Sequence, residues 1–142
     1  MAEKYIDIDT LKYLLYDIHN LEELLVRDRF QDHDKESLDM FIDSVKEFAD
    51  RELFPYVKEM DENPAYHKDG KVFVHDQVKT MMHKGGEMGL ISAPFNYEDG
   101  GMQIPFLSHT AATYILDAAN NHLPGYAGLT QGAAELIIHF AN

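Results

Sequence analysis

Residues 34–55 read DKESLDMFIDSVKEFADRELFP and carry the strongest helical signal in the chain. Apolar side chains recur there at steps of three and four residues, which places them on one face of an α-helix. That face is formed by Leu38, Phe41, Ile42, Val45, Phe48, Ala49 and Leu53. Asp34 is suited to cap the helix, because its carboxylate can accept hydrogen bonds from the free amides of the first turn. Pro55 has no amide hydrogen and disfavours helix just before it, so the helix should end or kink near Phe54.

Two shorter helices are expected upstream of this one. Thr10 should cap the first and Asn20 the second, since short polar side chains accept hydrogen bonds from first-turn amides. The inward faces are expected to be Leu11, Leu14, Leu15 and Ile18 in the first helix, and Leu21, Leu24 and Leu25 in the second.

The segment after Pro55 is less regular. Residues 61–74 contain several turn formers and should be a loop, with 71–75 compatible with a short extended piece. A fourth helix is expected after Asp76, and residues 90–104 should be irregular. This fourth helix should present Val78, Met81 and Met82 inward and dissolve at Gly85, Gly86 and Gly89.

Two further helices are predicted in the last third of the chain. The fifth should begin at Pro105, which suits a first turn, and the sixth at about Gly125. Their inward faces are expected to be Leu107, Ala111, Ala112, Ile115, Leu116 and Ala119, and then Leu129, Ala133, Leu136, Ile137 and Phe140. No pair of strands is predicted. The expected fold class is all-α, an antiparallel bundle of about five or six helices.

Composition limits the kinds of partner. The chain has 142 residues, which is the size of a single domain, and 45% of them are hydrophobic. Its formal net charge of −13 repels phosphate backbones and anionic lipid, so neither nucleic-acid nor membrane binding is expected. Cysteine is absent and the N-terminus has no recognisable secretory signal, which fits a cytoplasmic protein.

Pairs of histidine and glutamate raise the hypothesis of a metal site. His83 and Glu87 are one helical turn apart, and so are Glu135 and His139. A di-iron bundle needs a Glu-x-x-His pair on each of two helices and a glutamate from each of two others, which does not occur here. We therefore expect no metal site and interpret these residues as solvated polar faces.

Three glycines share one face of the expected sixth helix. Gly125, Gly128 and Gly132 lie three and four residues apart, and each costs roughly 1 kcal/mol relative to alanine inside a helix. One interpretation is close packing of a neighbouring helix, and the other is a surface hollowed out for a ligand. The spacing alone favours helix packing.

Several segments together resemble the acyl-CoA dehydrogenase family. Residues 41–55 resemble its first conserved helix, and residues 88–101, MGLISAPFNYEDGG, resemble its Gly-Leu…Pro-x-x-Tyr-Gly-Gly loop with two acidic residues inserted. Residues 128–142 resemble the helix that follows in the family. Residues 13–30 resemble the extra N-terminal segment of a longer-chain subfamily. The resemblance implies a helical extension at 1–33 and, at 34–142, the N-terminal helical domain of such an enzyme, truncated before its β domain.

The resemblance also implies an activity for the complete protein. Family members use FAD to oxidise an acyl-CoA thioester to the 2,3-enoyl-CoA, with a glutamate base removing the α-proton and the β-hydrogen leaving as hydride to the flavin. Both the flavin motif and the glutamate are implied to lie beyond this chain. No catalytic, cofactor-binding or metal-binding residue is therefore assigned here, and FAD is not expected to bind this piece alone. The implied partners are an acyl-CoA, an electron-transfer acceptor and further copies of the chain in a homo-oligomer.

In the family, the start of the last helix lines the acyl-chain end of the substrate pocket. The matching positions are Pro124, Gly125, Gly128 and Gly132, all of them small or compact. The resemblance therefore implies a roomy pocket for a long, branched or aromatic acyl group. The alternative from another class is a non-catalytic helical interaction or binding module.

Overall fold

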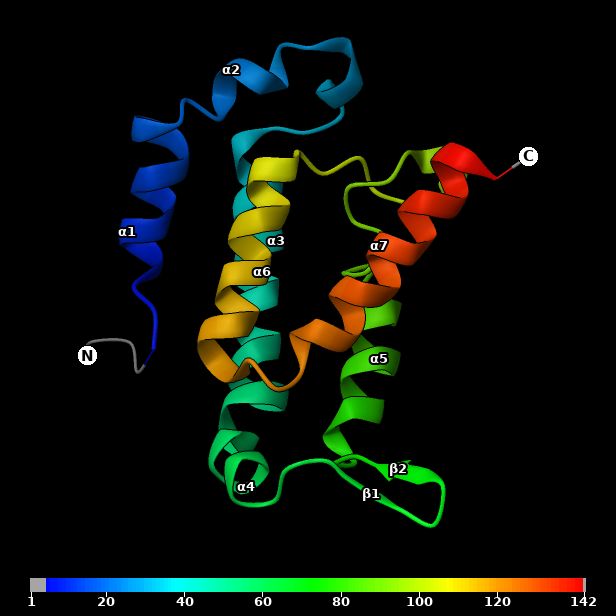
Figure 1. Cartoon of the computed structure of the whole chain (residues 1–142). Helices are drawn as coiled ribbons and strands as arrows, with labels where there is room; N and C mark the ends of the chain where they lie inside the picture. Colours follow the sequence, from blue (N-terminus) through cyan, green and yellow to red (C-terminus); the bar gives the residue numbers. More distant parts are fainter. Residues whose placement is uncertain (1–4, 142) are drawn as a thin grey trace.

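The computed structural model describes residues 5–141 and confirms a mainly helical fold (Figure 1). Its α-helices are α1 (Ile8–Tyr13), α2 (Glu22–Leu25), α3 (Lys35–Phe48), α4 (Val57–Glu62), α5 (Gln77–Glu87), α6 (Phe106–Asn120) and α7 (Pro124–Phe140). The long helices alternate in direction along the chain, so that α3 and α6, which pack together, run the same way. Asn142, the last residue of the predicted sixth helix, lies outside the described residues, as do residues 1–4.

The first helix is capped by Asp7, so the predicted Thr10 cap is wrong. Asp7 Oδ1 accepts the Thr10 backbone N–H at 3.2 Å, and its Oδ2 accepts the Thr10 hydroxyl at 2.9 Å. An aspartate three residues upstream thus takes the capping role. A wide π-helical turn over Leu14–Ile18 continues α1 and changes its phase. Of the predicted inward face, Leu11 and Leu15 are buried, whereas Leu14 and Ile18 are exposed.

The second predicted cap is also wrong. Asn20 has a positive φ of 49° and turns the chain ahead of α2 without capping it. Leu21 is fully buried, Leu25 is partly buried, and Leu24 is exposed. A left-handed turn therefore stands where we expected a helix start, because asparagine tolerates that conformation better than most residues.

The central helix α3 confirms the prediction from residues 34–55. Asp34 Oδ1 accepts the Ser37 N–H at 2.8 Å, and the Ser37 hydroxyl accepts the Asp34 N–H at 2.9 Å, which forms a capping box. Leu38, Ile42 and Val45 are fully buried. After Phe48, the chain passes through the π-helical turn η3 (Ala49–Leu53) and the 3-10 turn η4 (Phe54–Tyr56) before α4. This is the kink predicted near Phe54.

Side-chain amides from two other helices bind the backbone of η3. Gln77 of α5 donates to the Glu52 carbonyl at 2.7 Å, and Asn120 of α6 donates to the Leu53 carbonyl at 3.1 Å. The wide turn and Pro55 interrupt the regular helical hydrogen bonding, so carbonyl groups here can accept side-chain donors. Asn120 is only 1% exposed. The two hydrogen bonds hold α5 and α6 against the end of the central helix.

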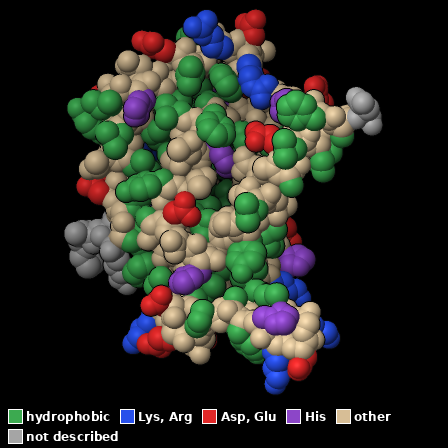
Figure 2. Space-filling model, in the orientation of Figure 1, with side chains coloured by type: hydrophobic (Ala, Val, Ile, Leu, Met, Phe, Trp, Pro, Cys, Tyr) green, Lys and Arg blue, Asp and Glu red, His purple; other side chains and the backbone are tan. Residues whose placement is uncertain are grey.

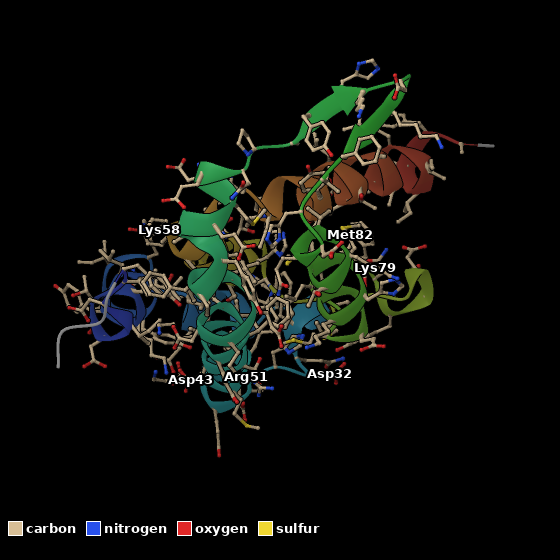
Figure 3. All side chains as sticks on the ribbon, turned by 90° about the horizontal axis from the view of Figure 1, so that it is seen from below. Asp32, Asp43, Arg51, Lys58, Lys79 and Met82 are labelled. Carbon is tan, nitrogen blue, oxygen red and sulfur yellow. The ribbon has the colours of Figure 1, made fainter. Side chains whose placement is uncertain are left out.

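A small hairpin corrects the prediction that no strands occur. The strands β1 (Tyr66–Lys68) and β2 (Lys71–Phe73) pair antiparallel, with Tyr66 opposite Phe73. Asp69 and Gly70 both have positive φ, as a tight two-residue hairpin turn requires. The extended piece predicted near residue 71 is confirmed. Seen from below in Figure 3, the hairpin projects from the helices, with Lys79 and Met82 labelled on α5 beneath it.

Helix α5 runs through the glycine pair at which we predicted that it dissolves. It continues to Glu87, because Gly85 is packed against Met81 and Leu90, which compensates for its low helix propensity. Gly89, with φ of 73°, ends the helix. The irregular stretch expected at 90–104 is confirmed and contains a single short 3-10 turn, η5 (Tyr97–Asp99).

The predicted inward face of α6 is confirmed, while that of α7 is wrong. Pro105 stands just before α6, and Pro124 is the first residue of α7. The buried residues of α7 are Pro124 and Ala127, whereas Leu129, Leu136 and Phe140 are 80%, 62% and 78% exposed. Helix α7 diverges from α6 along its length (Figure 1). The apolar side that we expected to face a core is therefore not covered by any of the residues that the structure describes.

Polar contacts dock the first helical segment on α3. The Tyr16 hydroxyl donates to Asp39 Oδ1 at 3.0 Å, and Lys12 pairs with Asp43 at 2.8 Å. The Lys35 ammonium lies 3.4 Å from the centre of the Tyr16 ring. Burial alone would raise the pKa of Asp39, but the hydrogen bonds from Lys35 and Tyr16 and the charge of Lys12 lower it overall.

Replacing Asn120 tests the amide contact with η3. Asn120→Ala should lower the free energy of unfolding by about 1–3 kcal/mol, because it leaves the Leu53 carbonyl and the His122 amide without their buried partner. The neighbouring exposed Asn121→Ala is the matched control and should change it by less than about 0.5 kcal/mol. Urea denaturation of both variants measures the difference. Equal midpoints would show that the buried amide does not stabilise the fold.

A pH series tests the docking of the first segment. Since the Asp39 pKa is lower in the folded protein, its carboxylate stabilises the fold above the ordinary pKa of 3.8, and this effect is lost as pH falls through the folded value. Asp39→Asn should therefore reduce the free energy of unfolding at pH 6 by about 1 kcal/mol or less, and the difference should shrink below pH 3.8. Asp32→Asn, at an exposed position labelled in Figure 3, is the control. A difference independent of pH would contradict this assignment.

Candidate functional site

A groove separates α6 from α7. It has a volume of about 500 Å³ and is open along one side. It is lined by Phe106, His109, Thr110, Thr113, Tyr114 and Asp117 of α6 and by Gly128, Gln131, Gly132 and Glu135 of α7. Beneath it lies a much smaller apolar cavity of about 30 Å³, to which α5 contributes Met81. The two spaces share His109, Thr113, Gly128 and Gln131.

The predicted site residues lie at the start and middle of α7. Gly128 and Gly132 line the groove, Pro124 and Gly128 line the small cavity, and Gly125 lines neither. A Cβ atom added to any of the three glycines would meet nothing within 4 Å among the described residues. Close packing of a neighbouring helix therefore does not account for these glycines in the described part of the chain. Gly128 and Gly132 leave the α7 wall of the groove without side chains at these two positions, between which Gln131 contributes a side chain.

His109 lines both the groove and the small cavity, and the sequence analysis did not identify it as a site residue. Burial lowers the pKa of its imidazole, while hydrogen bonding to the Gln131 side chain and the charge of Glu135 partly oppose the shift. The lowered pKa keeps the ring neutral at neutral pH. Its Nδ1 atom is buried and has no hydrogen-bond partner among the described residues. The available signal was a histidine within the otherwise small and apolar face of residues 107–119.

The threonine hydroxyls of the α6 wall already make hydrogen bonds within their own helix. Thr110 donates to the Phe106 carbonyl at 2.8 Å, and Thr113 donates to the His109 carbonyl at 3.1 Å. Asp117 stands at the far end, where burial raises the pKa of its carboxyl group. The groove therefore combines the aromatic rings of Phe106 and Tyr114 with the polar side chains of His109, Asp117, Gln131 and Glu135.

A second cleft, of about 360 Å³, lies between residues 29–30, the loop after Ala93 and the C-terminal part of α7. Arg29 spans it by donating to the Asn96 side chain and, at 3.2 Å, to the Pro94 carbonyl. Gln103 donates to the Arg29 carbonyl at 3.1 Å, and His33 Nε2 lies 2.9 Å from the Met102 carbonyl. These contacts fasten the first 33 residues to the irregular loop.

The glycine pairs do not form a phosphate-binding loop. Gly86 lies inside α5, and Gly100 has the positive φ of a turn. A Cβ atom on Gly101 would collide with the backbone of Phe95, so this glycine is required by the close approach of two loop segments. No group of three or more histidine, cysteine or acidic side chains in residues 5–141 is arranged to hold a metal ion. His139, one of the residues considered for a metal, has its Nδ1 2.9 Å from the Glu135 carbonyl of its own helix.

The outer side of α7 is an extended apolar surface. Large exposed apolar side chains occur there at Leu129, Leu136, Ile137 and Phe140. Figure 2 shows hydrophobic side chains exposed across the face that carries α6 and α7. Surfaces of this kind usually contact other protein. Within residues 5–141, no helix is long and apolar enough to cross a membrane.

The exposed face of α7 should make the 142-residue chain self-associate. Leu129→Lys should weaken that association, because a charge at the centre of an apolar contact is costly to bury. Val26→Lys is the matched control, since Val26 is also 80% exposed but lies outside α7. Sedimentation velocity over a concentration series measures the effect. A monomer at all concentrations, or equal effects of the two substitutions, would contradict the prediction.

Comparison with known proteins identifies the larger part of the chain. The family model described as acyl-CoA dehydrogenase, N-terminal domain, matches residues 35–142. No curated protein and no solved structure matches the chain. The matched region contains α3 to α7, both walls of the groove and the irregular loop.

Proposed function

This chain belongs to the acyl-CoA dehydrogenase family through its N-terminal domain, and from this we propose that the complete protein is an oxidoreductase that acts on acyl-CoA thioesters. The reaction proposed removes one hydrogen from each of carbons 2 and 3 of the acyl group and yields the 2,3-enoyl-CoA. An electron-transfer partner would receive the two electrons. We also propose that the complete protein is a homo-oligomer, which the exposed face of α7 supports.

The family is generally FAD-dependent, so we propose FAD as the cofactor of the complete protein. The described residues do not fit the flavin itself. Their glycine pairs serve a helix and a tight loop, and the net charge of −13 disfavours a pyrophosphate group. Flavin binding and base catalysis are therefore assigned to other parts of the complete protein.

The α6–α7 groove is the part of the acyl site that this chain would supply. The observation that carries the proposal is the open α7 wall, where Gly128 and Gly132 present no side chain. Pro124 adds a compact surface to the cavity below, and Gly125 keeps the beginning of α7 free of bulk. Burial of an acyl chain between the aromatic edge of α6 and this wall would be favourable by about 0.8 kcal/mol per CH₂ group. The groove volume of about 500 Å³ supports long, branched or aromatic acyl groups.

The alternative is a helical interaction module without catalysis. The exposed apolar side of α7 is the observation that favours it, because such a face suits a protein partner. The two functions differ in their need for a flavin, so a spectrum distinguishes them.

The visible spectrum of the full-length protein tests the dehydrogenase proposal. A purified yellow protein should lose its flavin absorbance on anaerobic addition of a suitable acyl-CoA, because the flavin accepts the two electrons. A panel of short, long, branched and aromatic acyl-CoAs identifies the preferred class. A colourless protein that FAD cannot reconstitute would contradict the proposal and favour the interaction module.

Filling the groove tests its role in acyl binding. Gly128→Leu in the full-length enzyme should reduce kcat/KM for bulky acyl-CoAs by about tenfold or more while sparing short ones, since steric loss of a favourable contact of about 1.4 kcal/mol corresponds to that factor. Gly86→Leu is the matched control, because it also lies in a helix and faces open space. An equal loss of kcat/KM for short and long substrates would show that the groove is not part of the acyl site.

A further inference from the structure

Lysine and arginine are absent from the part of the chain that forms the α6–α7 groove. Residues 85–142, which include both of its walls, contain five acidic side chains and no lysine or arginine. All lysine and arginine residues of the chain precede Gly85. His109, the histidine of the groove lining, has a lowered pKa and is neutral at neutral pH. The described walls therefore offer no cation to a ligand in the groove.

Two carboxylates line the groove, one near each end. Asp117 lies in the last turn of α6, next to the connection to α7. Glu135 lies at the other end, where the groove and the second cleft share this residue and Phe106. The stretch of α6 from Phe106 to Asp117 is about three helical turns long. Asp117 is exposed, so a ligand in the groove can approach its carboxylate without displacing another residue.

The Asp117 carboxylate has no neutralising partner in the described part of the chain. Burial by its surroundings raises its pKa, and no hydrogen bond or ion pair offsets that shift. Water thus solvates this group less than a free carboxylate, which strengthens its effect on a nearby charge. Arg29 borders the second cleft together with Glu135, but its guanidinium already donates to the Asn96 side chain and the Pro94 carbonyl.

We propose that the groove admits uncharged acyl groups and excludes acyl groups that end in a carboxylate, and that Asp117 and Glu135 set this preference. The inference rests on the proposed acyl-CoA dehydrogenase function and specifies its substrate class. A carboxylate at the distal end of the acyl group would lose water and meet charges of its own sign, with no cation from either wall. An alkyl or aromatic end would instead meet Phe106, Tyr114 and the glycine positions of α7.

The two carboxylates act on specificity alone. They disfavour the wrong substrate by repulsion, which is one of the two ways in which a site can discriminate between ligands. Both lie on the groove walls and take no part in the chemical step.

Two series of acyl-CoAs test the inference on the full-length enzyme. One series ends in a carboxylate and the other in a carboxamide of the same chain length, so that the members of a pair differ in charge and hardly in size. At the chain lengths that reach the groove, kcat/KM for the carboxamide should exceed that for the carboxylate by about tenfold or more, because like charges repel strongly in a partly desolvated site. Equal values at every chain length would overturn the inference.

Neutralising the two carboxylates assigns the preference to them. The double variant Asp117→Asn, Glu135→Gln should lower the ratio of carboxamide to carboxylate kcat/KM by about threefold or more, because it removes the repulsion and keeps the size of both side chains. The double variant Asp32→Asn, Glu87→Gln is the matched control, since it removes the same charge from exposed positions outside the groove. An unchanged ratio in the groove variant, or an equal fall in the control, would overturn the inference.

Reversing the charge at one position is an independent test of the sign. Asp117 is exposed and lies at the edge of the groove, so α6 can accommodate lysine there. Asp117→Lys should raise kcat/KM for the carboxylate series and leave that for the carboxamide series nearly unchanged. A rise shared equally by both series would contradict a charge effect and overturn the inference.

The same assays separate this inference from the proposed function. If no acyl-CoA bleaches the flavin, the dehydrogenase function fails and the inference fails with it. If plain acyl-CoAs bleach the flavin while carboxylate and carboxamide chains react alike, only the inference fails. Discrimination that depends on Asp117 and Glu135 supports both.

Discussion

The arrangement of the helices depends on the wide turn η3 at the end of the central helix. A π-helical turn followed by Pro55 makes backbone carbonyls available that a regular helix would use internally. Gln77 and Asn120 donate to them from α5 and α6, so each helix is held at a defined height along the central helix. The charged pair of Lys84 with Glu52, at 2.6 Å, reinforces the α5 side. Apolar packing alone would tolerate sliding of these helices, whereas directional hydrogen bonds do not.

Asn120, which binds η3, also determines where the groove opens. Asn120 Oδ1 also accepts the His122 amide at 3.1 Å, and Leu123, which follows, is fully buried. The turn between α6 and α7 is therefore anchored at its base, and α7 diverges from α6 beyond that point (Figure 1). Small residues at the start of α7 then leave the space between the helices unfilled. Asn120, which does not itself line the groove, thus anchors the turn from which the proposed acyl site opens.

The segment before α3 contributes in a different way. Its helix docks on α3 through Lys12 and Tyr16, and Arg29 reaches the loop that resembles the family's Gly-Gly segment. The division of the chain at residue 33 remains a prediction, but these contacts show that the first segment and the loop are held together. The loop borders the second cleft, so the segment stabilises the surroundings of that cleft as well as the bundle.

Local sequence determined the parts of this protein that depend on short-range physics. The capping box at Asp34, the kink at Pro55, the irregular loop and the apolar face of α6 follow from side chains within a few residues of each other, and so do the helix starts near the prolines. Tertiary structure decided the rest. Whether Leu129 or Ala127 faces the core depends on where α7 lies against α5 and α6, and helical periodicity alone could not distinguish the two faces of a helix that is apolar on most sides. In the same way, the spacing of Gly125, Gly128 and Gly132 predicted that they share one face of a helix. It could not show whether that face meets another helix or open space. The unpaired nitrogen of His109 arises only when three helices bury one side of the ring, so no pattern in the sequence could reveal it.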